Sequence, residues 1–144
     1  MFFLRNSLSD QRLLVKALVL VGIVRLALWL MPLRILREMV ERIYKRRSSS
    51  TTYQDIRMVR RVAASVRRVS RYVPAASCLT QALTTQFLLA RRGQVSSLVI
   101  GVAKSEAGEF KAHAWLESNG KIIIGGVNGP RSYMVLHPLE EGRQ

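Results

Sequence analysis

Residues 74–83 read Pro-Ala-Ala-Ser-Cys-Leu-Thr-Gln-Ala-Leu, and Cys78 within them is the only cysteine of the 144-residue chain. Ser77 fits a helix N-cap, so Cys78 is expected to open a helix that ends near Arg91-Arg92-Gly93. The unpaired N–H groups and positive dipole end of a helix stabilise a thiolate. Cys78 is therefore a candidate nucleophile, and a buried structural cysteine is the alternative interpretation.

The sequence after this helix has the alternation and turn residues of an antiparallel sheet. His113 lies in it, 35 residues after Cys78, where a strand would hold the imidazole rigidly as a general base. The predicted fold class is α+β, with N-terminal helices followed by a papain- or transglutaminase-like core in which a helix carries the cysteine and an antiparallel sheet the histidine. The predicted strands are 95–102, 110–118 and 121–124, with turns at 105–108 and at Asn119-Gly120.

Thiol sites of this kind usually have a third group that orients the imidazole. If Asn119-Gly120 is the turn, the position opposite His113 falls at Gly125-Gly126, where there is no side chain. The side-chain candidates for the third group are Asn128 and Glu117, and a backbone carbonyl is a further candidate.

Two more residues near the predicted dyad have alternative interpretations. Gln81, one helical turn after Cys78, is a candidate donor to an oxyanion or a cap for a neighbouring loop. Alternation places Trp115 on the same face of its strand as His113, where a core role is favoured over a substrate platform. One cysteine and two histidines give no metal-ligand cluster, so no metal is expected.

The net charge of +14 is concentrated in one half of the chain. Residues 1–73 carry 16 Lys/Arg against 4 Asp/Glu, whereas residues 74–144 carry 7 against 5. We therefore divide the chain into a basic helical region, 1–73, for docking or support and a cysteine peptidase core, 74–144. A basic surface attracts acidic peptides or proteins, anionic lipid or nucleic acid.

The most apolar stretch, 13–31, is predicted to be a helix that Pro32 ends. Lys16 and Arg25 interrupt it, and the uncharged runs between charges are shorter than the roughly 20 residues of a membrane span. We expect a buried or interface helix that a partner covers, with peripheral membrane attachment as the alternative.

Two further helices with a 3.6-residue apolar period are predicted before residue 74. The first follows Pro32 and has an apolar face of Ile35, Leu36, Met39, Val40 and Ile43. The second starts at a capping box over 52–55 and keeps Ile56, Val59, Val62, Ala63, Val66 and Val69 inward. Its outer face is rich in arginine, and the candidates for binding a partner are Arg60, Arg61, Arg67 and Arg68.

Several segments together resemble the transglutaminase-like leader peptidases of lasso-peptide biosynthesis, over about residues 72–140. These segments are Ser-Cys-Leu-Thr-Gln-Ala-Leu at 77–83, Leu-Leu-Ala-Arg-Arg-Gly at 88–93, Ile-Gly-Val at 100–102, Ala-His-Ala-Trp-Leu-Glu at 112–117 and Gly-Gly at 125–126.

The resemblance implies a cysteine peptidase without a cofactor, with Cys78 and His113 as its catalytic residues. Because a single cysteine fits a reducing compartment, a cytoplasmic location is expected. It would remove the leader from a ribosomally made precursor peptide and deliver the core to an asparagine-synthetase-like cyclase. The chain resembles the split form, which works with a separate leader-recognition protein.

Two other functions stay open. A transglutaminase or amide ligase would use the same Cys78–His113 dyad, and the mass of its product would distinguish it from a peptidase. A basic binding module with an inert cysteine is the non-enzymatic alternative, although no nucleic-acid recognition pattern accompanies the arginines, so no nucleic acid is expected. Slow labelling of Cys78 by iodoacetamide would favour that module.

Overall fold

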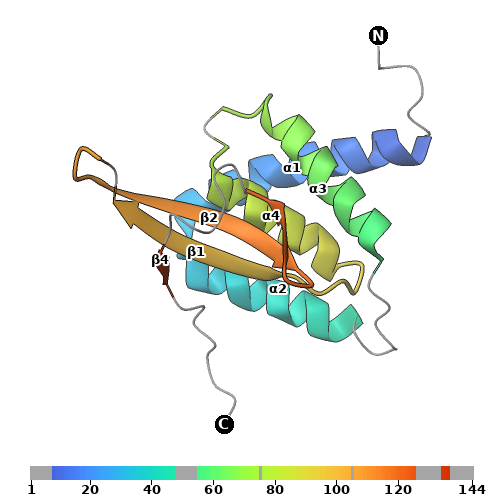
Figure 1. The fold of residues 1–144 in the computed structure, drawn as a ribbon. Helices are drawn as coiled ribbons and strands as arrows, with labels where there is room; N and C mark the ends of the chain where they lie inside the picture. The colour runs from blue at the N-terminus through green and yellow to red at the C-terminus, as the bar shows by residue number, and fades with distance from the viewer. Residues whose placement is uncertain (1–7, 48–54, 75, 105, 126–133, 137–144) are drawn as a thin grey trace.

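The computed structural model describes residues 8–47, 55–74, 76–104, 106–125 and 134–136. The described residues form four helices followed by a sheet (Figure 1), which confirms the predicted α+β class. The helices are α1 (Leu8–Leu30), α2 (Leu33–Arg47), α3 (Ile56–Ser70) and α4 (Cys78–Ala90). The strands are β1 (Ser97–Lys104), β2 (Phe110–Ser118), β3 (Lys121–Ile124) and β4 (Met134–Leu136).

The sheet is antiparallel throughout, with the strand order β3-β2-β1-β4. The bounds of β2 and β3 agree with the prediction, and β1 lies two residues later than predicted. Asn119 and Gly120 both have positive φ, as the two-residue turn between β2 and β3 requires. The sequence analysis missed β4, which pairs with β1 through Ile100–Leu136 and Val102–Met134.

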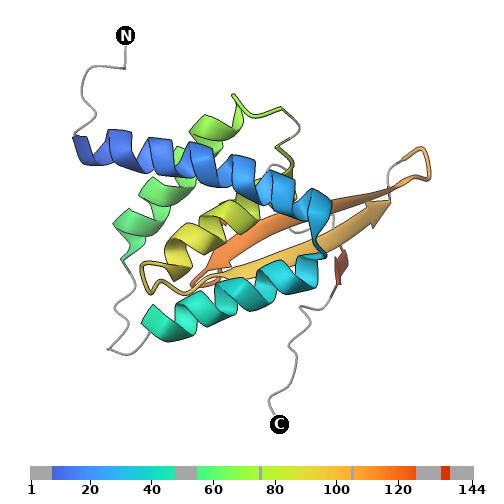
Figure 2. The same ribbon diagram turned by 180° about the vertical axis from the view of Figure 1, so that it is seen from behind.

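The helices gather on one face of the sheet, and α4 lies between the sheet and α1 (Figures 1 and 2). α4 also packs against α2, α3 and β2, so protein surrounds it on most sides. Thr80, Thr84 and Thr85 of α4 are buried. The hydroxyls of Thr84 and Thr85 donate to backbone carbonyls within the helix, those of Thr80 and Gln81, at 2.7 and 2.8 Å. α4 is thus the central element of the fold.

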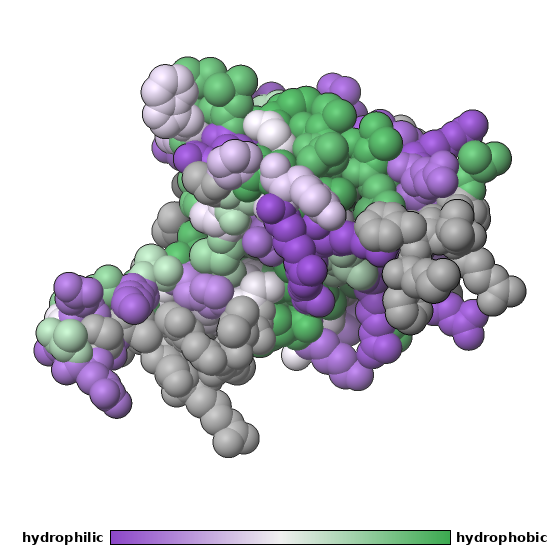
Figure 3. All heavy atoms as spheres, turned by 90° about the horizontal axis from the view of Figure 1, so that it is seen from above, coloured by the Kyte–Doolittle hydropathy of each residue, from purple (hydrophilic) through white to green (hydrophobic). Residues whose placement is uncertain are grey.

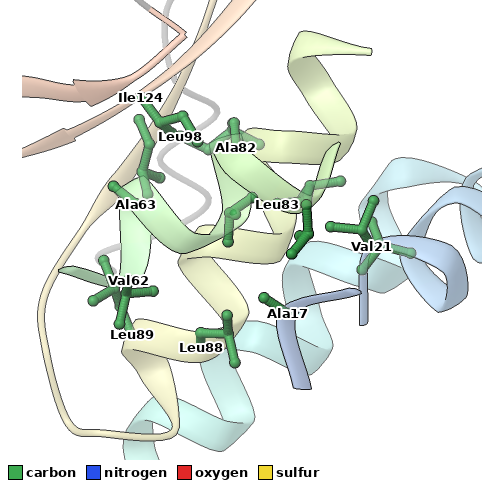
Figure 4. Packing of buried hydrophobic residues seen from close by; sticks show 14 of the residues in the cluster. Ala17, Val21, Val62, Ala63, Ala82, Leu83, Leu88, Leu89, Leu98 and Ile124 are labelled. Atoms are coloured by element: carbon green, nitrogen blue, oxygen red, sulfur yellow. The ribbon is translucent and has the colours of Figure 1, made fainter. Parts of the chain in front are cut away.

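Aliphatic side chains from all four helices and three strands form the core. Figure 4 shows Leu83 and Leu88 of α4 among side chains of α1 and α3, with strand residues at one end of the cluster. The core therefore joins helices of the 1–73 region to α4 and the sheet. The largest fully buried side chains are Leu83, Leu88, Leu89, Leu116 and Ile124.

The start of α3 differs from the predicted capping box. Asp55 is itself the N-cap, since its carboxylate accepts from the backbone N–H groups of Arg57 and Met58, at 3.0 and 3.2 Å. The backbone N–H of Asp55 donates to the side-chain oxygen of the buried Gln94, at 2.9 Å. This contact ties the start of α3 to the loop after α4, which local sequence could not reveal. Residue 52 lies outside the described residues.

α1 and α2 bury narrower faces than their apolar residues suggest. In α2, Leu36 and Val40 are buried, but Ile35 and Met39 of the predicted face are exposed. In α1 the buried residues are Leu13, Ala17, Val21 and Val24, and most of the remaining apolar side chains face outward. By length and composition α1 could cross a membrane, a test that soluble core helices and N-terminal signal sequences also pass.

Candidate active site

Cys78 is the first residue of α4, as predicted. Ser77 is the N-cap, and its side-chain oxygen accepts from the backbone N–H of Thr80, at 3.3 Å. The thiol is half-buried and packs against the hydrophobic core. Cys78 therefore lies at the positive end of the central helix, where the first-turn N–H groups can stabilise negative charge on sulfur or on a reacting oxygen.

His113 lies on β2, opposite Gly101 of β1. Its ring stacks with that of Trp115 two residues later, with ring centroids 6.1 Å apart and an interplanar angle of 27°. Trp115 is buried, so its indole restricts the positions that the imidazole can adopt. The predicted shared face of these two side chains is confirmed.

A backbone carbonyl meets the imidazole of His113. The Nε2 atom lies within hydrogen-bonding distance of the Gly125 carbonyl oxygen, just after β3. Gly125 has a φ of +89°, and a Cβ at this position would lie 2.6 Å from the carbonyl oxygen of Ala114. Only glycine allows the chain to pass so close to β2 in this conformation. Gly125 thus brings its carbonyl to the histidine.

This contact determines which ring nitrogen can act as a base. A carbonyl oxygen only accepts, so Nε2 must carry the proton in the hydrogen bond with Gly125. In the neutral ring Nδ1 then holds the lone pair that can accept a proton. The backbone carbonyl therefore does what a third side chain does in many thiol sites, and a backbone carbonyl was among the predicted alternatives.

The two side-chain candidates for the third group have different outcomes. Glu117 accepts a hydrogen bond from the indole N–H of Trp115, at 2.8 Å. Its carboxylate thus holds the tryptophan that stacks on His113, and acts on the imidazole only through that ring. Asn128 lies outside the described residues.

Gln81 lies one turn after Cys78 on α4 and is half-buried. Its backbone N–H donates to the Ser77 carbonyl, and its own carbonyl accepts from Thr85. Among the described residues its side chain has no recorded hydrogen bond, so the cap of a neighbouring loop that we considered is not seen there. The role of oxyanion donor stays a prediction.

The structure brings the elements of Cys78 and His113 together, because α4 packs against β2. Cys78 packs against the core that contains Ala114 and Leu116, whereas His113 alternates with these residues along β2. Within the described part of the chain no hydrogen bond joins the thiol to the ring. The structure thus shows the two elements in contact but not the thiol against the imidazole, and the dyad belongs to the proposal below.

The four arginines predicted to bind a partner have different surroundings. Arg61 pairs with Asp10 and donates to Ser9, so it fastens α3 to α1. The guanidinium of Arg67 lies 3.4 Å from the carbonyl oxygen of Ile123 on β3. Arg60 is exposed. Arg68 belongs with Arg67, Arg71, Ala64 and Ser65 to the lining of a hollow of about 380 Å³.

Positive charge also accumulates at the other end of α4. Burial lowers the pKa of Arg92, and the nearby Arg91 and Arg61 lower it further. The end of α4 opposite Cys78 is thus electropositive as well. Among the described residues no group of three or more His, Cys, Asp or Glu side chains could hold a metal ion.

Comparison with known proteins gives one family. The family model described as the transglutaminase-like superfamily matches residues 17–137, from within α1 to just beyond β4. No curated protein and no solved structure matches the chain. Enzymes of this superfamily commonly depend on a cysteine, so the match indicates a cysteine-dependent activity of the peptidase or transglutaminase type.

Proposed function

The chain belongs to the transglutaminase-like superfamily, and we propose that it is a cysteine peptidase that removes the leader from a ribosomally made precursor peptide. The observation that carries the proposal is the pairing of α4 with β2. The capped helix α4 starts with Cys78, the only cysteine. The strand β2, which packs against α4, carries His113, and the Gly125 carbonyl fixes the Nε2 atom of this histidine.

The first half of the reaction forms an acyl-enzyme. Nδ1 of His113 takes the proton of the Cys78 thiol, and the thiolate attacks the carbonyl carbon of the leader–core bond. The negative charge passes to the carbonyl oxygen, where the backbone N–H of Cys78 and the Gln81 side chain would donate to it. The carbon–nitrogen bond then breaks, and His113 gives its proton to the leaving amine of the core peptide.

The second half releases the leader. Water attacks the thioester carbon while Nδ1 of His113 accepts a proton from it. The carbon–sulfur bond breaks, the leader leaves with a new carboxyl group, and the thiol of Cys78 is restored. No cofactor enters any step, and the Gly125 carbonyl keeps a proton on Nε2 while Nδ1 gains and loses its own.

The substrate and partners follow from the resemblance to the leader peptidases of lasso-peptide biosynthesis. In this proposal a separate leader-recognition protein presents the precursor, and an asparagine-synthetase-like cyclase receives the core. Of the four arginines first considered, Arg60 and Arg67 are exposed and are the better candidates for attracting an acidic segment of these partners. Arg61 already has its carboxylate partner in Asp10.

A transglutaminase or amide ligase is the second candidate, because the superfamily includes this chemistry. The acyl-enzyme at Cys78 would then react with an amine instead of water. The two candidates share the nucleophile and base and differ only in the final acceptor. The mass of the product therefore separates them.

The test uses the precursor peptide and the leader-recognition protein that this proposal requires. Mass spectrometry should detect free leader and free core with the wild type and with Ser77→Ala, but neither product with Cys78→Ala. Cleavage by Cys78→Ala at a near wild-type rate would exclude the proposed nucleophile. A product joined to an added amine would instead favour the transglutaminase. Circular dichroism should confirm that both variants fold.

A further inference from the structure

The outward face of α1 is apolar over its C-terminal half. We call this surface the α1 strip, and Figure 3 shows a continuous hydrophobic area along α1 with hydrophilic side chains around it. The only charged residue between Leu18 and Leu30 is Arg25, which is half-buried at the side of the helix. The strip consists of the exposed residues Leu18, Val19, Ile23, Leu26, Trp29 and Leu30.

The residues of the strip offer almost nothing to a polar partner. Among their side chains, only the indole N–H of Trp29 can donate a hydrogen bond, and none can accept one. Protein–protein interfaces typically have about one hydrogen bond per 100–200 Å². The α1 strip has almost no hydrogen-bond donors or acceptors over three helical turns, so the acyl chains of lipid match it better than a protein surface does.

The charge distribution also favours lipid as the partner of the α1 strip. Towards the N-terminus the same face of α1 continues with Arg12 and Lys16, both exposed. A second copy of this chain would bring two net charges of +14 together, which opposes self-association through the strip. Anionic lipid headgroups would complement the cations while their acyl chains cover the apolar side chains.

We propose that the α1 strip inserts into the surface of an anionic lipid bilayer, with the axis of α1 parallel to the membrane plane. The parallel orientation follows from the opposite face of α1, where Ala17 and Val21 are fully buried in the core. A spanning orientation would remove these residues from α3 and α4. Trp29 would lie at headgroup level, the depth that tryptophan prefers in membranes. The inference is independent of the proposed peptidase activity.

Membrane attachment through α1 would leave the sheet in water. α1 lies on the side of α4 away from the sheet (Figure 2), so the sheet would lie on the side of the protein that is farther from the bilayer. The candidate site of Cys78 and His113 would then stay accessible to a peptide from the aqueous side.

The two tryptophans provide a direct measurement. Trp29 is 77% exposed and Trp115 is 2% exposed, so a change in tryptophan fluorescence on adding lipid reports mainly on Trp29. Vesicles of phosphatidylcholine with phosphatidylglycerol should shift the emission to the blue and co-sediment the protein. Phosphatidylcholine alone should bind less, and high salt should weaken binding. Trp29→Phe should lose most of the spectral change but still co-sediment.

Matched variants test the surface itself. Ile23→Asn with Leu26→Asn should abolish co-sedimentation. Ile56→Asn with Phe110→Asn, which change apolar residues elsewhere that are at least as exposed, should keep it. Arg12→Gln with Lys16→Gln, which leaves the apolar strip intact, should lower affinity for anionic vesicles by about 30-fold. The proposal would be overturned if the wild type bound neither kind of vesicle, or if the Ile23/Leu26 variant bound anionic vesicles as well as the wild type does. It would also be overturned by a dimer, in sedimentation velocity without lipid, that the same variant abolishes.

Discussion

α1 and α4 are both apolar around most of their circumference, but only α4 is surrounded by protein. α4 packs against the other three helices and the sheet, whereas α1 buries only one narrow face. A sequence reports which side chains avoid water and does not report what covers them. A similar apolar composition is therefore found in α4, which is enclosed by the fold, and in α1, which has an exposed apolar face.

The comparison also separates two kinds of function. The candidate nucleophile lies on the enclosed helix, where its position is held by the cap and the core. The candidate lipid surface lies on the open helix, where side chains can reach a partner. If this division is right, substitutions on the two helices should have different kinds of effect, and the following predictions test it.

The largest effect is expected at the start of α4. Cys78→Ala and His113→Ala should each lower leader cleavage by about 10³-fold or more, because a nucleophile and its base act as a unit. His113→Ala should also slow the labelling of Cys78 by iodoacetamide at neutral pH. Cleavage rates and labelling rates of the purified variants are the measurements. Unchanged labelling in His113→Ala would argue against proton transfer from the thiol to this ring.

The next effect compares leucines on the two helices. Leu83 of α4 is 1% exposed, so Leu83→Ala should lower the free energy of unfolding by about 2–5 kcal/mol. Leu26 of α1 is 56% exposed, and Leu26→Ala should change it by less than about 0.5 kcal/mol. Urea unfolding measures both values. A similar loss for both leucines would mean that α1 is buried in solution, for example in an oligomer.

A third effect compares two glycines. Gly125→Ala should destabilise the fold by about 1–3 kcal/mol, because alanine is strained at positive φ and its Cβ would meet the Ala114 carbonyl. Cleavage should fall as well, since the Gly125 carbonyl orients His113. Gly22→Ala in α1, where a Cβ meets nothing, should instead stabilise by about 0.5–1 kcal/mol. Thermal unfolding of both variants and the cleavage rate of Gly125→Ala test this contrast.

The smallest effect concerns the cap of α4. Ser77→Ala removes the acceptor for the Thr80 N–H and should cost about 1 kcal/mol of stability. Activity should largely persist, because the core still holds the helix. Chemical denaturation gives the first value and precursor cleavage the second. Loss of cleavage in a folded Ser77→Ala protein would show that the cap also positions the thiol.

Local chemistry explains which parts of the fold the sequence could predict. The Asn119-Gly120 turn and the alternation beside it were sufficient for the bounds of β2 and β3. β4 has only three residues, and the Asn128-Gly129-Pro130 turn signal before it does not specify a partner strand, so its pairing with β1 depends on a contact between distant segments. An interface helix was expected over 13–31, but which of its residues stay open depends on how many neighbours the fold supplies.

The candidate site divides in the same way. Cys78 and His113 were identifiable because their side chains have distinctive chemistry and lie at recognisable positions. The partner of the imidazole is a main-chain oxygen, which every residue possesses. Counting from the Asn119-Gly120 turn could therefore place Gly125-Gly126 opposite His113 but could not show that a carbonyl makes the contact. The hydrogen bond from Trp115 to Glu117 joins neighbours on one strand face, but only the folded chain shows that it is made.

The register shift between β2 and β3, at Leu116 and Glu117, has a consequence for insertions and deletions. Successive residues of a strand point to opposite faces, so losing or gaining one residue in this hairpin would turn Ile124 out of the core and the Gly125 carbonyl away from His113. The loop between β1 and β2 has no such constraint, since residues 106–109 are exposed. Natural variants of this protein should therefore differ in length at the first hairpin and keep the second at constant length.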